Sequence, residues 1–126
     1  MNIASYSDLL QAARAQAEPQ RMLFAFARAE RPDASQGTLT PVMCVDKTLD
    51  QLSTFEALVA ESGHTGAHWD IVFVSSMSGR AGAPPSSSEA ETPLNMMLNT
   101  IHTGEVGRFL AFARDGQLLS FTASDA

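Results

Sequence analysis

Two segments of this chain are apolar on both faces of an extended strand, and this feature constrains the fold most. In residues 22–29 both alternating sets of side chains are apolar: Met22, Phe24 and Phe26 on one face, and Leu23, Ala25 and Ala27 on the other. Residues 71–74 form an unbroken apolar run inside a second segment, residues 69–77. A strand that is apolar on both faces needs cover on both sides. The pattern therefore predicts a central sheet between two layers, with residues 69–77 as an interior strand.

Three further segments have the composition of strands: residues 39–45, 107–113 and 117–122. Pro41 lies near the start of the first of these segments, where a missing N–H suits a strand start or an edge strand. Asp115-Gly116 is a hairpin turn signal, so the last two strands are expected to lie side by side.

Capping signals predict three helices. The first begins near Ser5 and stops before Pro19, and the second opens with the capping box of residues 48–51. The third begins either in the capping box of residues 86–89 or at Thr92, with Pro93 as the first helical residue. We take the proline start as the better signal.

These elements predict an α/β fold with the order α-β-β-α-β-α-β-β, and residues 1–126 as one domain. The central sheet is expected to be mixed, with about five strands and three helices. The strand–helix–strand unit of residues 39–77 favours two parallel strands. The order of the strands stays open, because the long connection of residues 30–38 does not force its two flanking strands to pair.

Composition excludes several classes of function. The net charge is −6, from 8 basic and 14 acidic residues, and Lys47 is the only lysine. An acidic chain without a basic stripe is repelled by phosphate backbones and anionic membranes, so neither nucleic acid nor a membrane is an expected partner. Cys44 is the only cysteine, which excludes a disulfide framework within one chain. Without a signal peptide or a long apolar run, the expected compartment is the cytoplasm.

The predicted topology directs attention to one edge of the sheet. Ligands of open α/β sheets bind outside the carboxyl ends of parallel strands. The candidate ligand-binding residues at that edge are Asp46, Lys47, Ser78, Gly79 and Arg80. Arg114 and Asp115 would join them if the strand at 107–113 were also parallel.

Residues 78–88 are read as a flexible loop rich in Gly, Ser and Pro. A glycine-rich loop before a helix can bind an anion through its backbone N–H groups, and Arg80 could then hold a carboxylate or phosphate. The competing interpretation is a mobile surface loop without a ligand, which is the commoner case.

No other residue pattern predicts a catalytic or metal centre. Cys44 is expected to pack as a small apolar residue within its strand rather than to act as a nucleophile. His64 and His68 have the i, i+4 spacing of zinc ligands, but Gly63 and Gly66 interrupt the helix that this spacing needs. No cofactor and no metal are therefore expected.

Three stretches of sequence carry a family resemblance: LLQAARAQAEPQRMLFAFARAE, LTPVMCVDK and WDIVFVSSMSGR. With them the chain resembles a small family of uncharacterised proteobacterial proteins that often bear the label "ribonucleotide reductase subunit alpha". The label does not describe a plausible chemistry for this chain. A catalytic subunit of that enzyme needs a large barrel and several redox cysteines, whereas this chain has 126 residues and one cysteine.

Two function hypotheses follow. The first is a non-enzymatic cytoplasmic binding or adaptor module that associates with itself or with another protein, because no catalytic constellation can be assembled. The alternative is a sensor or enzyme for a small anionic ligand, using the edge around Asp46, Lys47 and Arg80.

Overall fold

The computed structural model describes residues 3–30, 38–107 and 109–119. Its elements follow the chain in the predicted order, which confirms the α/β fold class. The elements are α1 (Tyr6–Arg14), β1 (Gln20–Glu30), β2 (Thr38–Thr48), the 3-10 helix η1 (Leu49–Gln51), α2 (Phe55–Ser62), the 3-10 helix η2 (Gly63–Thr65), β3 (Ile71–Ser78), α3 (Ser87–Thr103), β4 (Leu110–Ala113) and β5 (Leu118–Leu119).

The sheet has five strands in the order β2-β1-β3-β4-β5, and every pair of neighbours is antiparallel. The expected mixed sheet is therefore wrong. β2 and β3 do run in the same direction, as their strand–helix–strand connection requires, but β1 lies between them and is antiparallel to both. β3 is interior, and the Asp115-Gly116 turn places β5 beside β4, as predicted.

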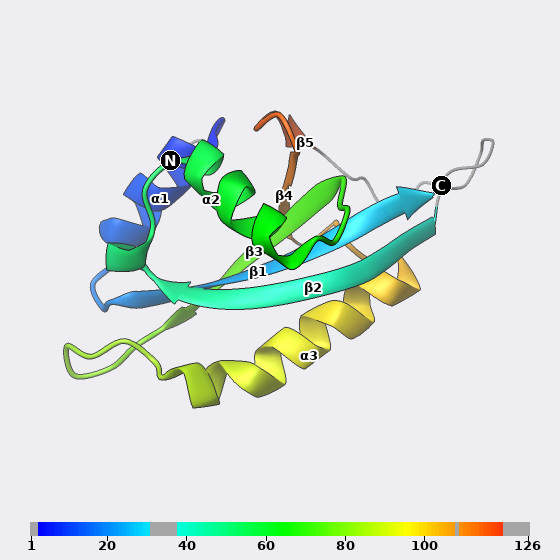
Figure 1. Ribbon diagram of the computed structural model, residues 1–126. Coiled ribbons are helices and arrows are strands. Elements are labelled where there is room, and N and C mark those ends of the chain that lie inside the picture. Colours follow the sequence, from blue (N-terminus) through cyan, green and yellow to red (C-terminus); the bar gives the residue numbers. More distant parts are fainter. Residues whose placement is uncertain (1–2, 31–37, 108, 120–126) are drawn as a thin grey trace.

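A helical layer covers each face of the sheet (Figure 1). α1 and α2 lie on one face, over a cluster that includes Met22, Phe24 and Phe26. α3 lies on the other face, over a cluster that includes Leu23, Ala25 and Ala27. The two alternating sets of β1 side chains thus enter two separate cores, which confirms the prediction drawn from residues 22–29.

The second and third helices begin elsewhere than predicted. The capping box of Thr48 and Gln51 forms, but it opens only η1, and α2 starts later with Thr54 as its N-cap. α3 starts at the capping box of Ser86 and Glu89, so Pro93 lies inside the helix rather than at its start. Side-chain hydrogen bonds at both ends of the box outweighed the proline preference.

Several predicted boundaries also move. β1 and β2 are longer than the predicted segments, and β4 is shorter than residues 107–113. The predicted loop of residues 78–88 is shorter, because α3 already begins at Ser87. Residues 31–37 of the predicted connection, and residues 120–122 of the predicted last strand, lie outside the described residues.

Tyr6 places a polar hydroxyl group in the apolar core beneath α1 and α2. Its ring is 5% exposed and makes edge contacts with Phe55 and Phe112, but its hydroxyl has no hydrogen-bond partner among the described residues. Burial raises the pKa of the Tyr6 hydroxyl to about 12, so the group stays protonated and neutral at pH 7.

We expect Tyr6→Phe to raise the free energy of unfolding by on the order of 1 kcal/mol, because a buried hydroxyl without a partner destabilises the folded state. Urea unfolding followed by the fluorescence of Trp69, the only tryptophan, measures the change. Tyr6→Leu is the control, and it should destabilise the protein because the ring contacts are lost. A loss of stability in Tyr6→Phe would show that the hydroxyl is satisfied in solution.

Candidate functional site

The predicted edge residues Asp46 and Lys47 lie near one another on β2, but their side chains point to opposite faces of the sheet. The Asp46 carboxylate forms a 2.6 Å ion pair with Arg21 of β1 on the α3 face. The Lys47 ammonium lies 2.7 Å from the carboxylate of Glu61, which belongs to α2. Both charged side chains are therefore paired within the protein.

The other predicted residues hold the connection between β3 and α3 together. Gln20 donates a hydrogen bond to the Ser78 hydroxyl, and the Gly79 N–H donates to the carbonyl of Pro19. Arg80 and Ala83 exchange two backbone hydrogen bonds across a tight turn. Ser78 and Gly79 thus contribute to the structure of this connection.

An internal carboxylate already lies at the start of α3. Glu89 accepts a hydrogen bond from the Ser86 N–H and lies 3.3 Å from the guanidinium of Arg80. The hydrogen bond from the Ser86 backbone is the main reason why the pKa of Glu89 is lowered. The protein's own Glu89 therefore takes the position at which the anion hypothesis would place a ligand.

Arg114 and Asp115 do not join this edge. β4 is antiparallel to β3, and Ala113 pairs with Ile71 at the start of β3. Arg114 donates to the carbonyl of Trp69 at that end of the sheet, away from Ser78. The condition for placing these two residues at the candidate edge, a parallel β4, is therefore not met.

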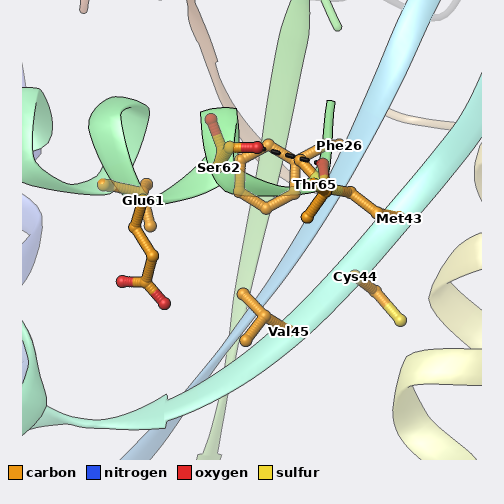
Figure 2. A pocket seen from close by; sticks show the side chains of 8 residues that line it. Phe26, Met43, Cys44, Val45, Glu61, Ser62 and Thr65 are labelled. Atoms are coloured by element: carbon orange, nitrogen blue, oxygen red, sulfur yellow. Dashed lines mark hydrogen bonds between the residues drawn. The ribbon is translucent and has the colours of Figure 1, made fainter. Parts of the chain in front are cut away.

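A different site lies between the edge strand β2 and the helix α2, and we call it the β2–α2 groove. It has a volume of about 180 Å³ and is lined mostly by apolar side chains. Figure 2 shows Met43 and Val45 of β2 on one side and Ser62 and Thr65 on the other. The residues that line the groove are Phe26, Met43, Cys44, Val45, Leu58, Glu61, Ser62 and Thr65.

Cys44 borders the groove through its main chain. Cys44 pairs with Ala25, whose side chain enters the core on the α3 face. Its sulfur accordingly points away from the groove in Figure 2. Because Cys44 still lines the groove, its backbone atoms must form part of the border. The groove therefore reaches the backbone of the edge strand.

The prediction that Cys44 packs in the core is wrong, because the residue is exposed on the edge strand. Partial burial of its sulfur and, to a smaller extent, the nearby charge of Asp46 raise the pKa of the Cys44 thiol. At neutral pH the thiol is therefore mostly protonated, and a protonated thiol is a poor nucleophile.

The outer backbone edge of β2 is unpaired in the part of the chain that the structure describes. β2 is the terminal strand of the sheet, and its 11 residues pair only with β1. In Figure 1, α2 lies on one side of β2 and α3 on the other, and no helix or strand runs along its outer side. Natural edge strands are usually shortened or protected, so an open edge of this length indicates a place for another strand.

Pro41 marks one end of the open edge. The register between β1 and β2 shifts next to its pairing position with Ala27. A proline and an irregular register are two devices that end pairing along a sheet edge. The part of β2 that follows, residues 42–48, contains both Met43 and Val45 of the groove.

The only tryptophan lies directly behind the groove. The Trp69 indole N–H donates a 2.8 Å hydrogen bond to the Ser62 hydroxyl, which in turn donates to the carbonyl of Val59. The Trp69 ring also meets the ring of Phe26 edge-on at a centroid distance of 5.0 Å. Two residues that line the groove are thus held by contacts to a fully buried indole.

A second groove runs beside α3. Its volume is about 340 Å³, and Met77, Met96, Met97 and Phe109 are among the residues that line it. Met96, which is 63% exposed, is the one large apolar residue among those described that is exposed.

No group of three or more His, Cys, Asp and Glu side chains in residues 3–30, 38–107 and 109–119 is arranged to hold a metal ion. No helix within the same ranges is long and apolar enough to cross a membrane.

Comparison with protein-family models, with curated proteins and with solved structures finds no match to this chain. The family resemblance described above therefore stays a prediction, and the function has to be inferred from the geometry.

Sequence reasoning did not identify the β2–α2 groove, although two of its signals were present. Pro41 indicated an edge strand, and Met43 and Val45 alternate as groove-facing residues should. What no pattern showed was that β1, rather than β3, would be the one strand paired with β2 among the described residues. That pairing is what leaves the edge next to α2 open.

Proposed function

We propose that the protein is a non-enzymatic binding module that receives an extended polypeptide segment along the outer edge of β2. The single observation behind this proposal is that the open edge of β2 borders an apolar groove formed with α2. An edge strand beside a helix, with a groove between them, is the geometry by which several peptide-binding domains add a strand to a sheet.

In this mode of binding the two parts of the site have separate roles. The unpaired N–H and C=O groups of β2 form hydrogen bonds with the main chain of the incoming segment. Alternate side chains of that segment point toward the groove, where Met43, Val45 and Leu58 provide apolar contacts. The volume of the groove suits one aliphatic side chain, which acts as the anchor of the segment.

The experiment is a selection of random nonapeptides on the whole protein, followed by a backbone N-methyl scan of the tightest synthetic binder. N-methylation at the residues that face β2 should raise the Kd by up to about tenfold for each lost hydrogen bond, whereas at the intervening residues it should have little effect. The fluorescence of Trp69 is the readout, because its indole contacts two residues that line the groove.

Two variants of the same strand test the side-chain contribution. Met43→Ala removes one wall of the groove and should weaken binding several-fold, whereas Cys44→Ala changes a side chain on the opposite face and should not. Failure of the selection to give a binder, or an N-methyl scan without alternation, would rule out strand addition. Native mass spectrometry of the protein from its own cells shows whether the chain associates with a second copy, and competition of the selected peptide with that association shows whether the copy occupies the edge.

A further inference from the structure

Charge is unevenly distributed over the two helices that follow β2 along the chain. η1 and α2, which follow β2, carry Asp50, Glu56 and Glu61 but no lysine or arginine. All three acidic side chains are on exposed residues. The elements beside the open edge therefore present negative charge to the solvent.

The ion pair at the groove itself is asymmetric. Glu61 lines the groove with 51% of its side chain exposed, whereas the side chain of its partner Lys47 is only 14% exposed. Lys47 is the only ion-pair partner of this carboxylate within the described ranges. A ligand in the groove thus meets the carboxylate of Glu61 before it meets the ammonium of Lys47.

We infer that the segment bound along β2 carries a lysine or arginine beside its apolar anchor, and that this cation pairs with Glu61. This inference rests on the proposed function. Since Lys47 leaves half of the Glu61 side chain exposed, the carboxylate can accept a second donor. Asp50 and Glu56 lie outside the groove, and they add a longer-range attraction for a basic segment as it approaches.

A second copy of this chain fits this site poorly. The only basic residue of β2 is Lys47, which is mostly buried and already bound to Glu61. Two chains that each carry a net charge of −6 also repel one another. The occupant that the charges favour is therefore a basic, partly apolar segment of a different protein.

The test uses the selected nonapeptide and a version in which its basic residue is replaced by glutamate. The selected sequences should be enriched in lysine or arginine, and the glutamate version should bind at least about tenfold more weakly at low salt. High salt should reduce the difference, because the pair is at the surface. Glu61→Gln should abolish or reverse the preference, whereas Glu105→Gln, on the turn after α3, should leave it unchanged.

The outcomes separate this inference from the proposed function. If the N-methyl scan alternates but binding does not depend on the charge of the peptide, strand addition stands and the basic partner is refuted. If Glu61→Gln keeps the full preference for the basic peptide, the assignment to Glu61 is refuted. If the N-methyl scan shows no alternation, the proposed function itself fails.

Discussion

Replacing Trp69 by alanine is expected to lower the free energy of unfolding by about 3–5 kcal/mol, the usual range for truncating a buried tryptophan. The indole is 0% exposed and packs edge-on against Phe26. Its N–H donates to Ser62, and the guanidinium of Arg114 lies 4.7 Å from the ring centroid. Since domains are stable by only about 5–15 kcal/mol, the variant should lose a large part of its stability. Urea unfolding followed by far-UV circular dichroism measures this loss without needing the tryptophan.

The matched control for this prediction is Arg114→Ala. Arg114 is exposed, so losing its contact with the ring and its hydrogen bond to the Trp69 carbonyl should lower the stability by only about 1–2 kcal/mol. Trp69→Ala should also weaken peptide binding, because Ser62 and Phe26 both line the groove. A loss below about 1 kcal/mol in Trp69→Ala would mean that the core around Phe26 repacks, and that the groove does not depend on the indole.

The parts of the fold that could be predicted are those set by local patterns. The alternation of residues 22–29 predicted two covered faces, because a strand's side chains alternate whatever the strand pairs with. Ser5 predicted the start of α1 for a similar reason, since its hydroxyl caps a backbone N–H only three residues away. Neither prediction needed knowledge of distant contacts.

The predictions of the fold that were wrong depend on pairing between segments that are distant in the sequence. Residues 39–77 predicted two strands in the same direction, which is correct, but not that β1 would lie between them. The tight pairing of β1 with β2 makes the sheet antiparallel, and no signal in residues 30–38 fixed that pairing. The end of β4 lies away from the predicted site for a separate reason, which is that β4 is antiparallel to β3.

The candidate site likewise had features that local sequence could predict and features that depend on contacts between distant residues. Lys47 and Arg80 were chosen as cations that an anion could meet, but the fold gives each of them an acidic partner, Glu61 and Glu89. These partners lie 14 and 9 residues further along the chain. The sequence revealed which residues could bind a charge, whereas only the three-dimensional arrangement revealed that they bind each other.

Replacing Gly79 by alanine is the second substitution for which we expect a large loss of stability. It tests whether the turn after β3 needs a glycine at this position for structural reasons. An added Cβ would lie 2.0 Å from the Ala83 oxygen and 2.8 Å from the Pro19 oxygen, both of them backbone atoms. Gly79→Ala must therefore open the turn and weaken or break three backbone hydrogen bonds. Two of these bonds join Arg80 and Ala83, and the third runs from the Gly79 N–H to the Pro19 carbonyl. At about 0.5–1.5 kcal/mol for each bond, we expect a loss of about 1.5–4.5 kcal/mol in the free energy of unfolding.

A glycine elsewhere in the chain separates this effect from the general preference for glycine in turns. Gly63 has a φ of −67° and no atom within 4 Å of an added Cβ, so Gly63→Ala should be neutral or stabilise the protein by about 0.4–1 kcal/mol. Urea midpoints of the two variants, measured by Trp69 fluorescence, give the comparison. If Gly79→Ala were as stable as Gly63→Ala, the close approach of the backbones would not exist in solution. That result would favour a role for Gly79 in ligand binding, because such a role predicts that Gly79→Ala lowers the affinity for the ligand and leaves the stability of the fold unchanged.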